Sequence, residues 1–300
     1  MTTDEPAAAA RPLVYAHRGS SGTFAEHTRA AYLQAIADGA DGVECDVHLT
    51  RDQHVVLLHD ATLDRTSDGT GQVADRTLQE LQELDFSSWK GARIPEAYGA
   101  KSGQFLTLPD LLDILRAAGR GIGLAIEFKH PSPYQLRLED RALEVLRVEG
   151  WDPRTSMLEN ITVSFMSFSP DSVKHLLESV PAAAVCQLVD DVNVADIREE
   201  LGLGALTGGA LANVMKAAQA EGERILAAAE AGIAGPGIGY VRTHAPAVQR
   251  WLASGLRCRV WTVDTEDDVE RCRKLGIQEI TTNWPAQVLS QLMADSRPPR

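Results

Sequence analysis

The sequence predicts an α/β protein of the (β/α)8 TIM-barrel class, with a small insertion after the second strand. Short β-rich runs alternate with helix-period segments along most of the chain, and this alternation is typical of a parallel sheet. One β-rich run is interpreted as the second arm of a hairpin, which leaves eight strands for the barrel. The chain has 300 residues, enough for a barrel of about 250 residues with insertions.

The strands are predicted from runs of apolar and β-branched residues. The barrel strands span residues 13–17, 42–49, 124–129, 161–166, 184–189, 232–237, 258–263 and 279–284, and the hairpin arm spans 55–59. An open, doubly wound sheet is the alternative fold. No G-x-G-x-x-G follows the first strand, which disfavours that alternative.

Helices are predicted where apolar residues recur at a helical period. They span residues 27–38, 109–118, 134–148, 171–179, 245–253, 266–275 and 286–294. The insertion, at about 60–105, is rich in Gly, Ser and charge and contains one short helix at 78–84. The Gly-rich stretch 202–209 does not directly follow an apolar run, so we expect a loop there rather than a phosphate cradle.

Composition limits the partners of the chain. A formal net charge of −13 repels nucleic acid and anionic membranes at long range, so we expect neither as a stable partner. A small anionic substrate stays compatible, because Arg, Lys or a metal reverses the sign locally. No stretch approaches the roughly 18 apolar residues of a membrane span, and the N-terminus lacks the features of a signal peptide.

The remaining global features also favour a cytoplasmic protein. Residues 1–11 are expected to be a disordered leader, and 12–300 a single catalytic barrel domain. The four cysteines have no CxxC spacing, and buried free thiols are the simplest interpretation. They are Cys45, Cys186, Cys258 and Cys272.

Charged and titratable residues gather where neighbouring strands end, which is the edge that carries active sites in TIM barrels. They are His17, Arg18, Glu44, Asp46, His59, Asp60, Glu127 and Lys129. A lone histidine at a strand end is more often structural than catalytic. Convergence of so many polar side chains from adjacent strands predicts an active site instead.

Three of these residues are carboxylates that predict a metal site. Glu44 and Asp46 share one face of the second strand and lie about 6.6 Å apart along it. With Glu127 at the same mouth, they either take up protons or surround a cation. Oxygen ligands of this type suit Mg²⁺ or Ca²⁺, so one such divalent cation is predicted. His48 shares the face and is expected to be an outer-shell or rim residue.

The other residues predict chemistry on a phosphate group. His17 and His59 suit general acid–base work near neutral pH. The planar fork of Arg18 can hold two phosphate oxygens, and Lys129 supplies a second positive charge. A solvated strand end is an equally good interpretation of Lys129 from its spacing alone.

These segments resemble the glycerophosphodiester phosphodiesterase family over residues 14–285. The matching motifs are HRG, GADGVECDV, HDATLDRT, LAIEFK, SFMSFSP, RVWTVD and ITTNWP. The resemblance implies a barrel with this insertion, acid–base roles for both histidines, a metal on the three carboxylates and phosphate contacts from Arg18 and Lys129. It also implies that Trp261 lines the pocket for the alcohol, where a packed strand aromatic is the alternative.

The chain departs from the family pattern in two places. AEHT stands where the family usually has PENT, so that Ala25 and His27 replace Pro and Asn. Asp264 replaces the Asn of W-T-V-N. Neither change removes a predicted catalytic residue, but the first alters a loop beside the phosphate site, where substrate fit or pH dependence is expected to differ. The stretch 192–222 is less similar and is expected to shape specificity.

The resemblance implies hydrolysis of glycerophosphodiesters to glycerol 3-phosphate and an alcohol such as choline, ethanolamine or glycerol. The nucleophile is either water or the substrate's own 2-hydroxyl, and either histidine could be the acid. A lysophospholipase D-type enzyme is the alternative, but its acyl groove is not evident, since the insertion is polar apart from Phe86, Trp89, Ile94 and Phe105. A non-catalytic barrel that binds a phosphorylated ligand is less favoured, because no predicted catalytic residue is lost.

Overall fold

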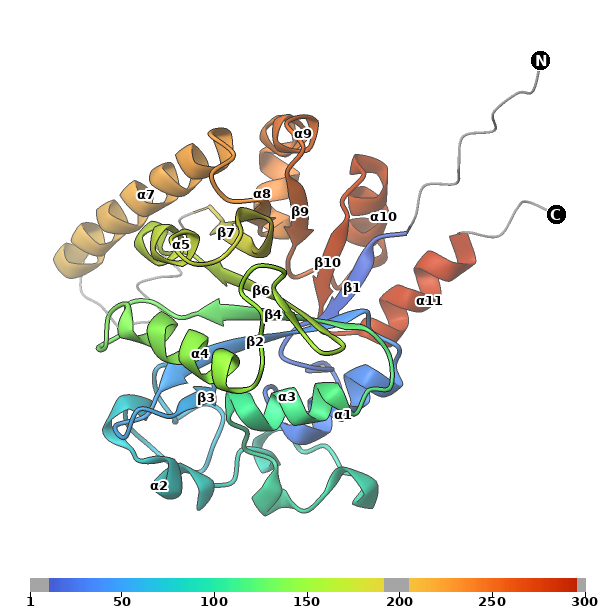
Figure 1. The fold of residues 1–300 in the computed structure, drawn as a ribbon. Coiled ribbons are helices and arrows are strands. Elements are labelled where there is room, and N and C mark those ends of the chain that lie inside the picture. Colours follow the sequence, from blue (N-terminus) through green and yellow to red (C-terminus); the bar gives the residue numbers. More distant parts are fainter. Residues whose placement is uncertain (1–10, 192–204, 296–300) are drawn as a thin grey trace.

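The computed structural model describes residues 11–191 and 205–295, and its parallel strands close into a barrel surrounded by helices (Figure 1). In sheet order the barrel strands are β1 (Leu13–Ala16), β2 (Gly42–Leu49), β4 (Ile122–Phe128), β6 (Ile161–Ser167), β7 (Val185–Val189), β8 (Ile233–Pro236), β9 (Arg257–Val260) and β10 (Glu279–Thr282). β1 pairs in parallel with both β10 and β2, which closes the ring. The predicted TIM barrel is confirmed.

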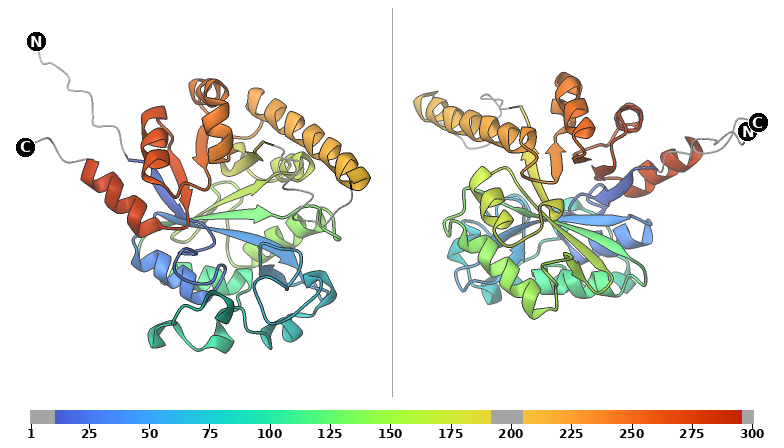
Figure 2. Two further views of the ribbon diagram at one scale, coloured as in Figure 1. Left: turned by 180° about the vertical axis from the view of Figure 1, so that it is seen from behind. Right: turned by 45° about the horizontal axis from the view of Figure 1, so that its top comes forward.

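Helices cover the outside of the barrel, as the two further views show (Figure 2). They are α1 (Arg29–Ala37), α3 (Leu108–Arg116), α4 (Arg137–Val148), α5 (Pro170–Leu177), α7 (Ala205–Ala227), α8 (Ile238–Thr243), α9 (Ala245–Ala253), α10 (Glu266–Leu275) and α11 (Pro285–Asp295). The seven helices predicted outside the insertion all occur, with small differences at their ends. Among the described helices, α7 and α8 were not predicted.

The predicted loop at 202–209 is wrong where the structure describes it. α7 is already helical from Ala205, and residues 202–204 lie outside the described chain. Ala, Leu, Met, Lys, Gln and Glu dominate the segment and favour a helix, and this preference outweighs the cost of about 1 kcal/mol for each of Gly208 and Gly209. The stretch expected to shape specificity therefore falls partly on α7 and partly outside the described residues.

The insertion packs beside a hairpin. β3 (Val55–Leu57) runs antiparallel to β2, which confirms the predicted arm. The insertion then forms α2 (Leu78–Gln82) and four 3-10 turns, η1 (Val73–Asp75), η2 (Ser88–Lys90), η3 (Glu96–Tyr98) and η4 (Lys101–Gly103). Buried apolar side chains of the insertion, including Leu63, Leu81 and Phe86, pack against Val56 and Leu58. Two short elements complete the described set, β5 (Met157–Leu158) and η5 (Ala182–Ala184).

Alternation along β2 sends its side chains to two environments. Val43, Cys45 and Val47 are fully buried in the core between the sheet and its helices. Glu44 and Asp46 therefore face the barrel interior. The four cysteines are free and buried, as predicted. No helix within the described residues is long and apolar enough to cross a bilayer.

The lower interior of the barrel holds a second polar group, which we call the floor cluster: Tyr15, Ser164, Arg259 and Glu279. Arg259 is 1% exposed, and its Nε donates to Glu279 Oε2 at 2.6 Å while Nη1 donates to Ser164 Oγ at 3.0 Å. Its guanidinium also lies 4.3 Å from the centre of the Tyr15 ring. Glycines make room for this ring, because a Cβ at Gly123 would lie 2.3 Å from the Tyr15 hydroxyl.

Candidate active site

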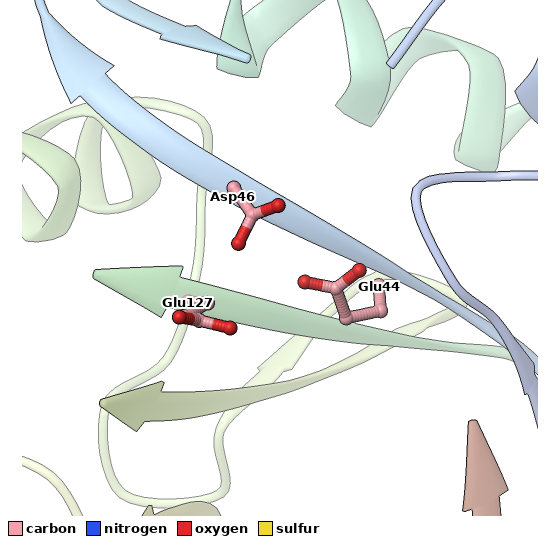
Figure 3. A group of neighbouring side chains, drawn as sticks. All are labelled: Glu44, Asp46 and Glu127. Carbon is pink, nitrogen blue, oxygen red and sulfur yellow. The ribbon is translucent and has the colours of Figure 1, made fainter. Parts of the chain in front are cut away.

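Three buried carboxylates face one another at the mouth of the barrel (Figure 3). Glu44 and Asp46 extend from β2 and Glu127 extends from β4, where it is the register partner of Asp46. One oxygen of each residue lies within 4.8 Å of the others. We call this group the mouth cluster. The structure thus brings together the three predicted metal ligands, and the group they form could hold a metal ion.

Two oxygens of the mouth cluster test whether a cation fits there. Glu44 Oε1 and Asp46 Oδ1 are buried and have no hydrogen-bond partner. Buried polar atoms nearly always find a partner, so two unpartnered acceptors on neighbouring carboxylates call for one. Carboxylate oxygens are the ligands that Mg²⁺ and Ca²⁺ prefer. The donor set therefore fits a hard divalent cation.

The pKa values of the three carboxylates shift in different directions. Burial, together with the charges of Asp46 and Glu127, raises the pKa of Glu44 well above its ordinary value. Burial also raises the pKa of Glu127, although Lys129 opposes the shift. Burial acts the same way on Asp46, but Lys129, Arg18 and His27 outweigh it and lower the pKa of Asp46. Glu44 is consequently the carboxylate with the least compensation from neighbouring cations.

Arg18 and Lys129 lie directly against the mouth cluster. The backbone N–H of Arg18 donates to Glu44 Oε2 at 3.0 Å, and its side-chain Nε lies 3.0 Å from Asp46 Oδ2. Arg18 has a left-handed backbone, with φ 56°, and Gly19 continues the turn at φ 80°. Lys129 Nζ lies 2.8 Å from Glu127 Oε1 and 3.6 Å from Asp46 Oδ1. Lys129 thus lies against the mouth cluster and is not a solvated strand end, and its contact with phosphate stays a prediction.

His17 follows β1 and is oriented by a neutral amide. Its Nδ1 lies 2.8 Å from Asn283 Oδ1, an acceptor, so Nδ1 carries the proton and Nε2 keeps its lone pair. Asn283 is itself fixed by Asp264, which accepts from its side-chain amide at 2.5 Å and from its backbone N–H at 2.8 Å. Burial and the charge of Arg18 lower the pKa of His17 to about 3.

His59 follows β3 and is oriented by a carboxylate. Its Nδ1 donates to Asp60 Oδ1 at 2.6 Å, which again leaves Nε2 free. Arg65 Nε donates to the other oxygen of Asp60 at 2.7 Å, and both Arg65 Nη atoms donate to Glu26. Glu26 in turn accepts from Arg18 at 2.9 Å. We call this chain of contacts, from His59 through Asp60, Arg65 and Glu26 to Arg18, the rim network.

His48 contacts the backbone of His59 from β2. It is buried on β2, on the face that carries Glu44 and Asp46, and its Nε2 lies 3.1 Å from the carbonyl oxygen of His59. Burial lowers the pKa of His48 to about 4, so the neutral ring can donate this hydrogen bond near neutral pH. His48 thus contacts the backbone of His59, and its role as an outer-shell or rim residue stays a prediction.

The sequence did not predict the place of His27. We expected it in the first turn of a helix, but α1 begins at Arg29 after the N-cap Thr28, and His27 lies before it in a left-handed conformation with φ 60°. Its Nε2 lies 3.0 Å from Asp46 Oδ2, and its side chain is buried. The departure from the family pattern at AEHT indicated that this loop is unusual, but it did not indicate that His27 contacts Asp46. The links made by Asn283 and Arg65 were missed as well.

Trp261 lies on another part of the barrel wall, directly after β9. Its Nε1 donates to the carbonyl oxygen of Gly235 at 2.9 Å. Its ring meets the half-exposed Phe168 edge to face, with centroids 5.4 Å apart, and it packs against the interior apolar cluster that includes Met166 and Leu188. These contacts agree with a packed aromatic, and its role in a substrate pocket stays a prediction.

Comparisons with known proteins agree with this geometry. Residues 17–287 match the model of the glycerophosphoryl diester phosphodiesterase family. A Mycobacterium tuberculosis protein named "Probable glycerophosphodiester phosphodiesterase 1" is 33% identical over 97% of this chain and 96% of its own length. The glycerophosphodiester phosphodiesterase of Caldanaerobacter subterraneus subsp. tengcongensis is 27% identical over 93% of this chain and 97% of its own length.

Solved structures share the fold. A phosphodiesterase of Oleispira antarctica, in complex with the product sn-glycerol-3-phosphate, has a TM-score of 0.70 at 23% identity, over 94% of this chain and 97% of that one. The match to the family model covers most of the chain and confirms both the resemblance and the predicted enzyme class, a phosphoric diester hydrolase. With its barrel, its acidic mouth and its two strand-end histidines, the chain belongs to the glycerophosphoryl diester phosphodiesterase family.

Proposed function

We propose that the protein is a metal-dependent glycerophosphodiester phosphodiesterase, which hydrolyses its substrate to glycerol 3-phosphate and an alcohol. One observation carries the proposal. Two orphaned carboxylate oxygens, Glu44 Oε1 and Asp46 Oδ1, are buried beside the cations Arg18 and Lys129. A cation on the carboxylates together with these two side chains makes a pocket suited to a phosphate group. The product bound to the Oleispira antarctica relative supports this choice of substrate.

The carboxylates Glu44, Asp46 and Glu127 would hold one divalent cation, Mg²⁺ or Ca²⁺. When bound, such an ion stabilises the negative charge that develops on a phosphate oxygen. Arg18 offers the remaining N–H groups of its guanidinium to the phosphate, and Lys129 adds a point charge on the other side of Asp46.

The two histidines would move the protons. Each has its Nδ1–H fixed by an acceptor, Asn283 for His17 and Asp60 for His59, so that each presents Nε2 to the reaction. We assign His59 as the acid, because its Nδ1 partner is a carboxylate, Asp60, whereas the partner of His17 is a neutral amide. His17 is then the base, since burial and Arg18 keep its ring neutral. His17 would take the proton of the nucleophile, and His59 would protonate the departing alkoxide.

The experiment is turnover of glycerophosphocholine with Mg²⁺ or Ca²⁺ by His17→Ala and His59→Ala. We expect each variant to lose about 10²- to 10⁴-fold of the rate, the usual contribution of general acid–base catalysis. EDTA should abolish activity, and added cation should restore it. His175→Ala is the control, because His175 pairs with Asp140 on the outer helices. Wild-type turnover in both site variants would refute the acid–base mechanism. Activity that is insensitive to EDTA would show that the reaction does not need the metal.

The lysophospholipase D-type alternative gains no support from the insertion. Phe86 is buried and stacks on Phe105 at 4.5 Å, and Ile94 packs with Phe24. Of the apolar residues in question, Trp89 is the most exposed, at 39%. The insertion thus turns most of its apolar side chains inward. Turnover of lysophosphatidylcholine should accordingly be well below that of glycerophosphocholine, and the reverse ranking would favour the alternative.

A further inference from the structure

His27 connects several parts of the mouth cluster. Its Nε2 lies 3.0 Å from Asp46 Oδ2, and its Nδ1 lies 2.9 Å from the hydroxyl of Tyr32. That hydroxyl also lies 3.2 Å from the carbonyl oxygen of Glu44. The backbone N–H of His27 donates to the carbonyl oxygen of Arg18 at 3.1 Å. One imidazole thus reaches one predicted metal ligand directly and the backbone of a second through Tyr32.

The hydrogen bonds of this group define its proton positions. The Asp46 carboxylate only accepts, so Nε2 of His27 must carry a proton. In a neutral ring Nδ1 then accepts, so the single hydroxyl proton of Tyr32 is shared between two acceptors, Nδ1 of His27 at 2.9 Å and the carbonyl oxygen of Glu44 at 3.2 Å. Tyr32 is fully buried on α1, and His27 is 3% exposed, so water does not replace these contacts. Both ring nitrogens of His27 thus have a buried partner, Tyr32 at Nδ1 and Asp46 at Nε2, and these two contacts orient the ring.

This set determines which oxygen of Asp46 is available. Oδ2 is held by His27 and approached by Arg18 Nε, both at 3.0 Å. Oδ1 has no hydrogen-bond partner and lies on the side of Lys129, at 3.6 Å. A carboxylate held by one oxygen cannot rotate freely. Its other oxygen, Oδ1, therefore keeps a fixed direction and stays without a hydrogen-bond partner.

We propose that His27 is a positioning residue, which holds Asp46 so that its Oδ1 faces the divalent cation, while Tyr32 fixes the orientation of the His27 ring. The inference rests on the proposed metal site and adds to it a residue in its supporting shell. Partners of this kind commonly change metal affinity by 10- to 100-fold. The left-handed backbone at His27 is a conformation that His and Asn adopt more readily than most residues, which suits the imidazole to this turn.

The experiment measures Mn²⁺ affinity by electron paramagnetic resonance in the absence of substrate, so that it does not depend on turnover. We expect His27→Ala to weaken binding by about 10-fold or more. His27→Gln keeps an N–H donor at similar reach and should restore affinity to within about threefold of wild type. Tyr32→Phe, which removes only the hydroxyl, should give an intermediate loss of about threefold.

Two control variants make the same chemical changes elsewhere. Tyr240→Phe removes a buried hydroxyl that bonds Glu223, and His175→Ala removes an imidazole that bonds Asp140. Both should bind Mn²⁺ like wild type. Circular dichroism of the metal-free proteins checks folding, and where His27→Ala does not fold, Tyr32→Phe decides.

The outcomes separate this inference from the proposed function. If wild type binds no Mn²⁺, both are overturned. If wild type binds but folded His27→Ala, or Tyr32→Phe in its place, binds equally well, only the positioning role is overturned. Electron spin echo modulation gives a further readout. We expect no directly coordinated nitrogen in wild type, and a strong nitrogen signal that His27→Gln abolishes would make His27 a ligand and overturn the positioning role.

Discussion

The floor cluster and the mouth cluster are both buried polar groups inside one barrel, but their charges balance differently. At the floor, Arg259 meets Glu279 at 2.6 Å with both side chains almost fully buried, and Arg257 approaches the same carboxylate from the barrel end. At the mouth, three carboxylates face the two cations Arg18 and Lys129, and two carboxylate oxygens lack partners. We therefore expect the compensated floor cluster to support the fold, and the uncompensated mouth cluster to bind the proposed cation.

The largest expected effect is on the floor. Glu279→Gln should lower the free energy of unfolding by about 3–5 kcal/mol, because it leaves Arg259 buried without its counter-charge. Turnover per folded molecule should stay within about twofold of wild type. A twofold change is equivalent to only about 0.4 kcal/mol in the activation barrier. Urea unfolding and titrated activity measure the two quantities.

Glu270→Gln is the matched control for the floor. Glu270 pairs with Arg273 one turn along α10, on the surface, where water screens the pair, so Glu270→Gln should unfold close to the wild-type urea concentration. Unfolding of Glu279→Gln at the wild-type urea concentration would contradict the view that the floor pair supports the fold.

The opposite response is expected at the mouth. Glu44→Gln should reduce turnover by about 100-fold or more, equivalent to about 2.7 kcal/mol in the barrier, because it removes a charged ligand of the proposed metal. The metal-free protein should be as stable as wild type or more stable, since one buried like charge is lost beside Asp46 and Glu127. Urea unfolding in EDTA checks the second point, and a loss above about 1 kcal/mol would contradict it.

Cation binding should distinguish the two clusters directly. At a free Mg²⁺ or Ca²⁺ concentration of 100 times its Kd, wild type should gain about 2.7 kcal/mol against unfolding. Glu279→Gln should gain the same amount from its lower starting point, because its mouth is intact. Glu44→Gln should gain much less. Thermal unfolding with and without cation gives the measurement, and equal gains in all three proteins would place the binding site elsewhere.

The sequence could predict the mouth because its signals are local. Alternation along β2 puts Glu44 and Asp46 on one face, and a strand end is enough to expose His17 and His59. No local sequence pattern indicates the floor cluster, since Arg259 and Glu279 lie in ordinary apolar strand runs. Their contact depends on the parallel pairing of β9 with β10, and the third partner, Ser164, lies 95 residues from Arg259 in the chain.

The same distinction explains the details that were missed. The sequence pattern predicts His27 as the first residue of a helix. Only the fold of the loop brings it to Asp46, 19 residues away in the chain. α7 was not predicted, because the Gly-rich stretch at its beginning indicates a loop, although the residues that follow favour a helix. Local pattern thus predicted the strands, most helices and the chemical groups, whereas supporting contacts between distant segments required the structure.

The smallest expected effect tests the rim network, which is compensated like the floor but reaches solvent. Burial alone would raise the pKa of Glu26, but hydrogen bonds from Arg65 and the charge of Arg18 outweigh it and lower the pKa to about 2. The ionised form is therefore stabilised by folding. This contribution is fully present above the unfolded pKa of 4.5 and is lost as pH falls through the folded pKa of about 2.

Glu26→Gln should therefore be less stable than wild type at pH 7 by about 1–2 kcal/mol, a figure discounted because Arg65 is 45% exposed and water screens the pair. Unfolding free energies of the two proteins, measured from pH 7 to pH 2, should converge between pH 4.5 and about 2 as Glu26 takes up its proton. Added salt should shrink the gap at pH 7, while the gap produced by Glu279→Gln at the floor should hardly change, because buried pairs are screened much less. A gap that persists unchanged to pH 2 would mean that Glu26 acts through packing rather than charge, and the rim would then resemble neither cluster.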